Sequence, residues 1–275
     1  MEWYKKIIFL PIALLIISTG IITNNLLTTG EVLRRGVELT GGITVTIPLK
    51  QRVNITEISS RLPGAVVREI AGNQRAIIIQ SSSLNETQIL SVAKRFAEFN
   101  ESEIEIGRIE PVLGRVFWEQ SKIALLCTSV LIVCVIFFLF RSPLPCAAIL
   151  LALASNFVDT LAALSLMNVE LSIPVIGALL MMFGYSIDTN ILLTTSVMKK
   201  RGNLEVNVKN ARKTGLTVSV TSVISLITIY FLSQNYTIQV MSLVLCTGLL
   251  ADIVNTWVQN ACILRWFSER KGGSK

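Results

Sequence analysis

The chain has 275 residues, of which 52% are hydrophobic and only 16% are charged, and its formal net charge is +7. It contains no His, the commonest metal ligand and general base, and it lacks the G-x-x-x-x-G-K-S/T motif of nucleotide hydrolases. This composition indicates a membrane protein, and we expect no enzymatic activity, no metal site and no cofactor. The five Cys residues lie in apolar stretches, which predicts small core residues and not disulfides.

The first apolar run covers residues 7–27 and follows Lys5 and Lys6. It resembles a signal peptide, but its apolar core is longer than that of a signal peptide and no Ala-x-Ala site follows it. We therefore expect residues 1–30 to form a first transmembrane helix whose N-terminus lies in the cytoplasm.

The next part of the chain has frequent charges and short apolar runs, as expected of a small domain over residues 31–114. Alternating patterns predict four strands, at residues 43–49, 65–70, 75–80 and 103–109. Capping patterns at Asn54 and Asn85 predict two helices, which end at Leu62 and near Phe99. The order β-α-β-β-α-β is that of a ferredoxin-like α+β sandwich, and a domain of this size can hold a core of its own.

From Ser121 the chain is again apolar. It predicts five more transmembrane helices, near residues 121–140, 144–166, 171–195, 214–233 and 237–264. The fold class is therefore an α-helical polytopic membrane protein with six helices in a one-plus-five arrangement. A five-helix domain covers residues 115–267, and a cytoplasmic tail covers residues 268–275.

The distribution of Lys and Arg predicts the orientation. The two short loops on one side, residues 167–170 and 233–239, contain neither residue, whereas the loops and tails on the other side are basic. The positive-inside rule then places both termini in the cytoplasm and the ferredoxin-like domain outside the cell membrane. The basic charge is explained by topology and by contact with membrane lipids, and nucleic-acid binding is not expected.

Three aspartates, Asp159, Asp188 and Asp252, lie inside predicted spans. A carboxylate at the bilayer centre costs about 2.5–3.5 kcal/mol on insertion scales, which favours a protonatable site that faces other helices and is linked to ion movement. The alternative is an Asp that only forms hydrogen bonds with neighbouring helices. Asp188 and Asp252 are the preferred proton carriers, because Asp159 lies nearer the outer end of its span.

Polar residues near these aspartates recur at intervals of three or four and should form stripes that avoid lipid. The stripes are Ser155 with Asp159; Thr217, Thr221, Ser225 and Thr228; and Gly248, Asp252, Asn255, Thr256 and Gln259. For the Ser/Thr stripe we prefer ordinary helix packing as the explanation.

Other candidate residues lie close to Asp188 in the sequence or at the start of the fifth span. Gly184 lies one turn before Asp188 and would let a partner helix approach closely. Tyr185, Ser186 and Asn190 are predicted to pack at the same site. Arg212 and Lys213 open the fifth span from the cytoplasmic side and are candidates to steer a proton at Asp188.

Several motifs together resemble the SecD/SecF family of protein-export proteins. Phe183–Asn190 (FGYSIDTN) resembles the signature of the fourth span, and Lys213–Thr217 resembles the basic start of the fifth. Gly36–Gly42 (GVELTGG) resembles the Gly-x-Asp-x-x-Gly-Gly motif that begins the first external domain, with Glu38 in place of Asp. Glu110–Gly114 (EPVLG) resembles the Val-Gly-Pro-x-x-Gly start of the second span, with Glu in place of Gly.

The resemblance covers almost the whole chain. The one-plus-five layout is closer to SecF than to SecD, and an Asp directly after GYSI is similar to the archaeal form. It implies a subunit of SecDF, paired with SecD in the architecture of the RND transporters. That complex assists the export of polypeptides through the SecYE channel, driven by proton passage near the fourth-span Asp, here Asp188.

Two other classes of protein remain open at this point. The chain would be half of an RND-type exporter of lipids or small molecules if it held an apolar substrate pocket and a second large external domain. It would be a membrane scaffold without transport if Asp188 were only structural.

Overall fold

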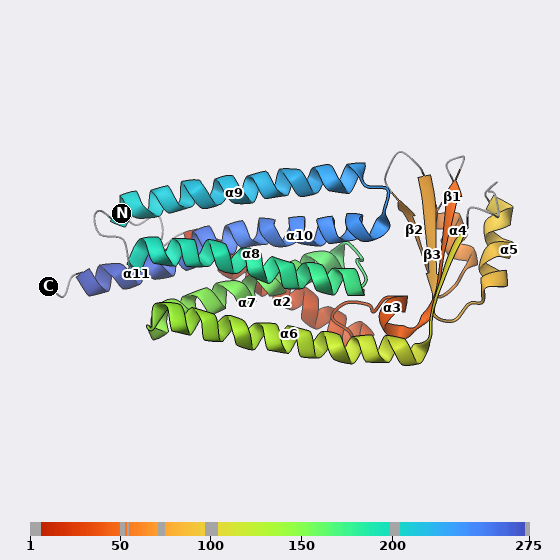
Figure 1. Cartoon of the computed structure of the whole chain (residues 1–275), viewed down its shortest axis with the longest axis horizontal. Coiled ribbons are helices and arrows are strands. Elements are labelled where there is room, and N and C mark those ends of the chain that lie inside the picture. Colours follow the sequence, from red (N-terminus) through yellow and green to blue (C-terminus); the bar gives the residue numbers. More distant parts are fainter. Residues whose placement is uncertain are drawn as a thin grey trace.

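A computed structural model describes residues 7–49, 53, 55–70, 75–96, 104–198 and 204–272. Six helices are long and apolar enough to cross a membrane, as predicted. They are α2 (Phe9–Thr29), α6 (Pro111–Phe140), α7 (Pro143–Leu166), α8 (Ile173–Met198), α9 (Leu204–Leu232) and a last helix. The last one consists of α10 (Tyr236–Val254), the π-helical η2 (Asn255–Asn260) and α11 (Ala261–Gly272). These helices form an elongated bundle with a small sheet domain at one end, here called the domain end (Figure 1).

The sheet domain confirms the predicted order of strands and helices. It contains β1 (Gly42–Leu49), α4 (Ile55–Arg61), β2 (Ala65–Ile70), β3 (Arg75–Ser81), α5 (Glu86–Phe96) and β4 (Glu105–Ile109). The antiparallel sheet has the order β2-β3-β1-β4, which is the ferredoxin-like arrangement. The backbone N–H of Asn85 donates to the side-chain oxygen of Gln88 at 3.1 Å, as a capping box requires. The predicted cap at Asn54, residues 71–74 between β2 and β3, and residues 97–103 lie outside the described residues.

Alternation along the strands builds the core of this domain. Val45 and Ile47 on β1 and Ile77 and Ile79 on β3 are fully buried, because every second residue of a strand faces the same side. The helices cover that side with a few equally buried residues, namely Ile58 of α4 and Ile89 and Ala93 of α5.

The chain enters and leaves the sheet domain through one tight crossing. Gly41 has a φ of 83°, and a Cβ there would lie 2.5 Å from the Cα of Pro111. A Cβ at Gly114 would lie 2.8 Å from the Gly41 nitrogen. Both glycines are thus required where α3 (Val37–Thr40) meets the beginning of α6. α6 starts ten residues before the predicted span. The prediction missed its first turns because they carry charges such as Arg115 and Glu119, and a hydropathy criterion excludes charged residues from a span.

Polar contacts fix the sheet domain to the domain end of the bundle. Arg68 of β2 donates to the hydroxyl of Tyr236 and, at 3.1 Å, to the carbonyl oxygen of Asn168. Its guanidinium also lies 3.7 Å from a carboxylate oxygen of Glu170. Burial raises the pKa of Glu170, and the positive charges of Arg68 and Arg34 oppose that shift. The Glu38 carboxylate accepts from the Ile173 amide at 2.8 Å and so caps the start of α8.

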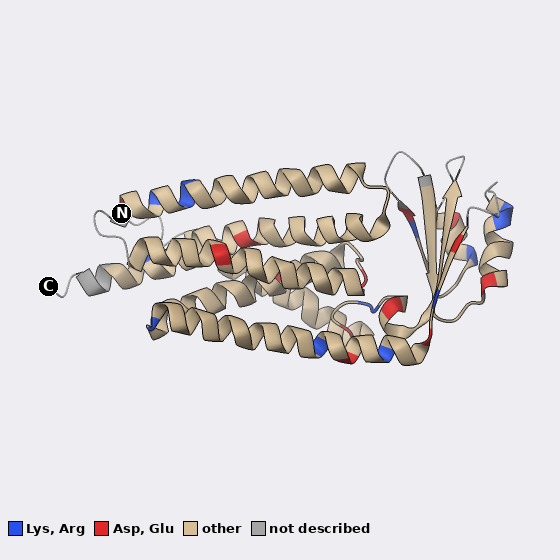
Figure 2. Ribbon diagram, in the orientation of Figure 1, with Lys and Arg blue, Asp and Glu red and all other residues tan. Residues whose placement is uncertain are grey.

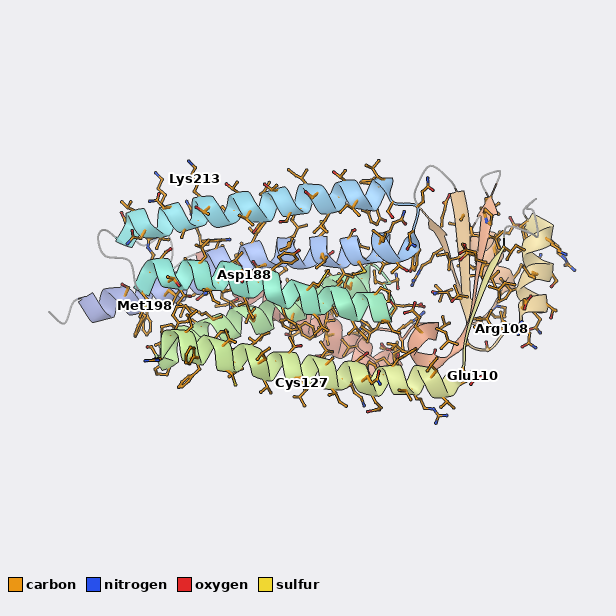
Figure 3. All side chains as sticks on the ribbon, viewed as in Figure 1. Arg108, Glu110, Cys127, Asp188, Met198 and Lys213 are labelled. Atoms are coloured by element: carbon orange, nitrogen blue, oxygen red, sulfur yellow. The ribbon has the colours of Figure 1, made fainter. Side chains whose placement is uncertain are left out.

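Within the bundle, α7, α8 and the last helix are central, whereas α2, α6 and α9 are mostly exposed. The prediction that all five Cys are core residues is therefore wrong for two of them. Cys127 and Cys134 are exposed on α6 (Figure 3 labels Cys127), because an apolar stretch on a peripheral membrane helix faces outward. All five are free thiols.

Candidate functional site

The middle of the bundle holds few charges, and acidic segments stand out there on α8 and α10 (Figure 2). The side chain of Asp252 on α10 is completely buried. Three hydroxyl groups surround its carboxylate. Ser186 and Thr256 donate to Oδ1, the latter at 2.9 Å, and Thr189 donates to Oδ2 at 2.8 Å. Asp252 thus joins α8 to α10 through a polar centre inside an apolar bundle.

The hydroxyl of Thr189 has two acceptors within 3 Å. Its oxygen lies 2.8 Å from Asp252 Oδ2 and 2.9 Å from the carbonyl oxygen of Ser186. A hydroxyl carries only one proton, so it donates to one of these acceptors at a time and keeps lone pairs free to accept. If Asp252 is protonated on Oδ2, that proton is donated to Thr189, and the Thr189 proton turns to the Ser186 carbonyl. Every polar group in the contact is then satisfied in both protonation states.

A chain of amides extends this centre toward the end of the last helix. Asn190 donates to the Thr256 hydroxyl at 2.8 Å, and Asn260 donates to the Asn190 side-chain oxygen at 2.6 Å. All three side chains are fully buried. Asn255–Asn260 form a π-helical segment, a feature found frequently at functional sites.

Asp159 of α7 has other hydrogen-bond partners than Asp252. Its Oδ2 accepts from the Asn255 amide at 2.8 Å, and its side chain is 5% exposed. The stripe on the last helix is thus buried as expected, with Asp252 facing α8 and Asn255 facing α7. The structure therefore brings two of the three candidate aspartates into the bundle.

Asp188 is the exception. Its side chain is exposed on α8 and makes no hydrogen bond or ion pair with any residue that the structure describes. Asp188 therefore does not face another helix of its own chain, and the prediction that it faces other helices stays a prediction about a partner. Gly184 and Tyr185 lie on the same open side, and nothing lies within 4 Å of a Cβ placed at Gly184. Of the predicted packing residues, only Ser186 and Asn190 are buried.

Arg212 and Lys213 do not reach Asp188. Both are exposed on α9, and neither forms an ion pair with Asp188 in the described chain. In Figure 3 the Lys213 side chain points away from α8, on which Asp188 lies. Asp188 and the two basic residues are therefore not partners within this chain.

The Ser/Thr stripe of α9 also lies on the exposed surface, contrary to the prediction. Each hydroxyl donates to the carbonyl oxygen four residues earlier, at 2.8 to 3.0 Å, as Thr217, Thr221, Ser225 and Thr228 show. A hydroxyl satisfied by its own helix does not need a second helix, which explains why the stripe is tolerated outside the core.

Sequence reasoning missed Thr189, Asn260 and Asn156 as interior polar residues. A signal for Thr189 was present, because it lies three residues after Ser186 and so shares a helix face with it. The same signal was present for Asn156, three residues before Asp159, and for Asn260, four residues after Thr256.

The comparisons with known proteins agree on one family. The model "Protein export membrane protein SecD/SecF, C-terminal" matches residues 88–270. The chain is 32% identical to the protein-export membrane protein SecF of Methanocaldococcus jannaschii, covering 96% of this chain and 95% of that relative. It is 31% identical to SecF of Methanothermobacter thermautotrophicus, covering 97% and 93%.

Solved structures show the same fold. The crystal structure of SecDF from Thermus thermophilus, described as a translocon-associated membrane protein, matches with a TM-score of 0.74 at 18% identity. The match covers 96% of this chain but only 38% of that longer chain. SecDF in its super-membrane-facing form matches with a TM-score of 0.63 at 21% identity. The six apolar helices, the small antiparallel sheet and these relatives lead to one conclusion: the chain belongs to the SecD/SecF family of protein-export membrane proteins, as a SecF protein with a role in protein export.

Proposed function

We propose that this SecF protein pairs with SecD and that proton movement at Asp252 drives its assistance to polypeptides passing through the SecYE channel. The observation that carries the proposal is the contact of Asp252 with Thr189, whose geometry lets both side chains keep a hydrogen bond with and without a proton on Asp252. A proton relay inside a membrane needs such a contact, because a polar group without a hydrogen-bond partner there would destabilise either the protonated or the deprotonated state.

The two protonation states hold α8 and α10 together differently. In the charged state Ser186 and Thr189 of α8 both donate to Asp252. In the neutral state one of these bonds reverses its direction and loses its charge assistance, which weakens the attachment of α10 to α8. Uptake and release of a proton thereby alter the packing of α10 on α8. Tyr236 at the start of α10 accepts a hydrogen bond from Arg68 of the sheet domain, which connects this packing to the domain.

The energy of one proton fits this role. One elementary charge crossing roughly 150 mV yields about 3.5 kcal/mol, at about 2.3 kcal/mol per 100 mV. Switching a two-state element from one side to the other takes about 5.5 kcal/mol. One proton thus biases the movement strongly, and an added pH difference or a second proton completes it.

An open stripe on α8 supports the pairing with SecD. Gly177, Met181, Gly184 and Asp188 follow one another at intervals of four, three and four residues. Nothing lies within 4 Å of a Cβ at either glycine, while Met181 and Asp188 are exposed. Small residues let helices approach closely, and a carboxylate facing lipid is costly, so a partner helix on this face would relieve both.

We expect Gly184→Leu to weaken association with SecD about tenfold or more, because the leucine side chain keeps the partner helix away from α8. The measurement is the amount of SecD that co-purifies with the chain in mild detergent. Gly20→Leu is the matched control, since Gly20 lies in α2 and nothing lies within 4 Å of a Cβ placed there. Undiminished recovery of SecD with Gly184→Leu would show that SecD binds elsewhere.

The proposed orientation has its own test. A membrane-impermeant maleimide added to intact cells should label Ser91→Cys on α5 and leave Glu205→Cys at the start of α9 unlabelled. Both positions are exposed, so accessibility of the side chain itself does not separate them. The unaltered chain measures labelling of the five native thiols. Equal labelling of the two added cysteines in intact cells contradicts the orientation.

Export itself is measured in inverted membrane vesicles that contain SecYE and SecD, with and without this chain and with and without a proton gradient. The proposal expects the chain to increase export mainly when the gradient is present. A membrane scaffold would give the same increase in both conditions.

A further inference from the structure

A second polar cluster lies inside the bundle, between α7 and η2. Ser155, Asn156 and Asp159 contribute from α7, and Asn255 and Gln259 contribute from η2; each is at most 5% exposed. Two hydrogen bonds join the facing surfaces. Asn255 donates to Asp159 Oδ2 at 2.8 Å, and Gln259 donates to the Ser155 hydroxyl at 3.1 Å. The spacing of four residues in both pairs keeps the cluster on one face of each helix.

This cluster has more acceptors than donors. Among the described residues, one buried amide nitrogen of the cluster, Asn156 Nδ2, and four buried oxygens have no hydrogen-bond partner, so the unpartnered acceptors outnumber the unpartnered donors. The oxygens are Asp159 Oδ1, Asn156 Oδ1, Asn255 Oδ1 and Gln259 Oε1. The orientation of Asn255 is fixed, because turning its amide over would set its oxygen against the Asp159 carboxylate. Buried polar groups in proteins nearly always have a partner, so four unpartnered oxygens in one place indicate a ligand.

The charge of Asp159 narrows the choice of ligand. Asp252 is surrounded by three hydroxyl donors, but Asp159 receives a single bond, from an amide. No Lys or Arg is buried among the residues whose burial is described, so no side chain neutralises Asp159 there. Water would supply donors but no charge. A proton on Oδ1 would neutralise Asp159 but would leave most of the amide oxygens without a partner.

We infer that Asp159, Asn156, Asn255 and Gln259 bind one dehydrated monovalent cation of the sodium class between α7 and η2. Oxygen ligands alone suit a hard cation. A single carboxylate balances a single positive charge, whereas a divalent ion would leave an excess charge in the membrane interior. The site is separate from Asp252 and does not depend on the proton-coupled function.

Binding of sodium alone tests the inference. The full chain, purified in detergent in choline chloride, is dialysed against radioactive sodium, and its melting temperature is followed as sodium replaces choline. We expect saturable binding of one sodium per chain and a melting temperature that rises with sodium. Asp159→Asn should abolish both, and Asn156→Ala should weaken binding about tenfold or more.

Asp188→Asn is the matched control, since it removes the same charge from an exposed position and should leave sodium binding unchanged. Melting of each variant in choline alone shows whether it is folded, so a loss of binding is not mistaken for unfolding. The inference is overturned if the unaltered chain shows no saturable sodium binding. It is also overturned if Asp188→Asn reduces binding as much as Asp159→Asn, because the charge effect would then be unspecific.

Discussion

Asp252→Asn is expected to abolish the stimulation of export by the proton gradient while leaving the complex with SecD intact. Asparagine keeps the shape of the side chain, and its amide oxygen and nitrogen still form hydrogen bonds with the surrounding hydroxyls, so the packing of α8 on α10 is preserved. It cannot take up a proton, which removes about 3.5 kcal/mol of driving energy per proton at roughly 150 mV. That energy corresponds to a bias of more than about a hundredfold. Export into inverted vesicles with and without a gradient measures the effect.

Variants at Thr189 show whether the proton itself moves through this contact. Thr189→Val keeps the shape but removes the hydroxyl that accepts a hydrogen bond from protonated Asp252 Oδ2. The stimulation of export by the proton gradient should therefore fall strongly. Thr189→Ser keeps the hydroxyl and should retain most of it. The alternative proton carrier on these helices is Asp188. If Asp188→Asn loses stimulation and Asp252→Asn keeps it, the proton passes at the exposed face of α8 and the assignment to Asp252 is wrong.

Gly215→Ala is expected to destabilise the bundle by about 1–3 kcal/mol, the usual cost of overpacking a core. A Cβ at Gly215 of α9 would lie 2.0 Å from Cζ2 of Trp257, so the indole ring must move. Trp257 of η2 is buried in a cluster with Leu193 and Ala211, and its ring is rigid. The melting temperature, followed by tryptophan fluorescence, should fall by about 2–4 °C per kcal/mol.

Gly20→Ala is the control for this substitution, because Gly20 is also a glycine inside a membrane helix but has nothing within 4 Å of a Cβ. It should leave the melting temperature unchanged or raise it slightly, since alanine favours a helix. Equal melting temperatures for both variants would show that α9 is displaced from η2 at no cost and that the close contact does not stabilise the bundle.

The sequence by itself determined the elements of this fold and their order. Membrane spans depend on about 20 consecutive apolar residues, and strands and caps depend on patterns of two to four residues, so both are visible locally. The capping box at Asn85 and the alternation of Val45 and Ile47 are examples that the structure bears out. The glycine motifs were also visible, although the reason for them, the crossing of Gly41 over Pro111 and Gly114, appears only in three dimensions.

Which aspartate is inside was decided by the tertiary structure alone. Hydropathy places Asp188 and Asp252 in membrane helices equally well. At 3.6 residues per turn, Ser186 and Asp188 are about 200° apart around α8, so packing that turns Ser186 toward Asp252 points Asp188 away from it, and no other helix of the described chain covers that side. The π-helical segment that turns Asn255 toward Asp159 likewise has no mark in the sequence. A sequence pattern records which residues share a helix face, but only the neighbouring helices determine which face is buried.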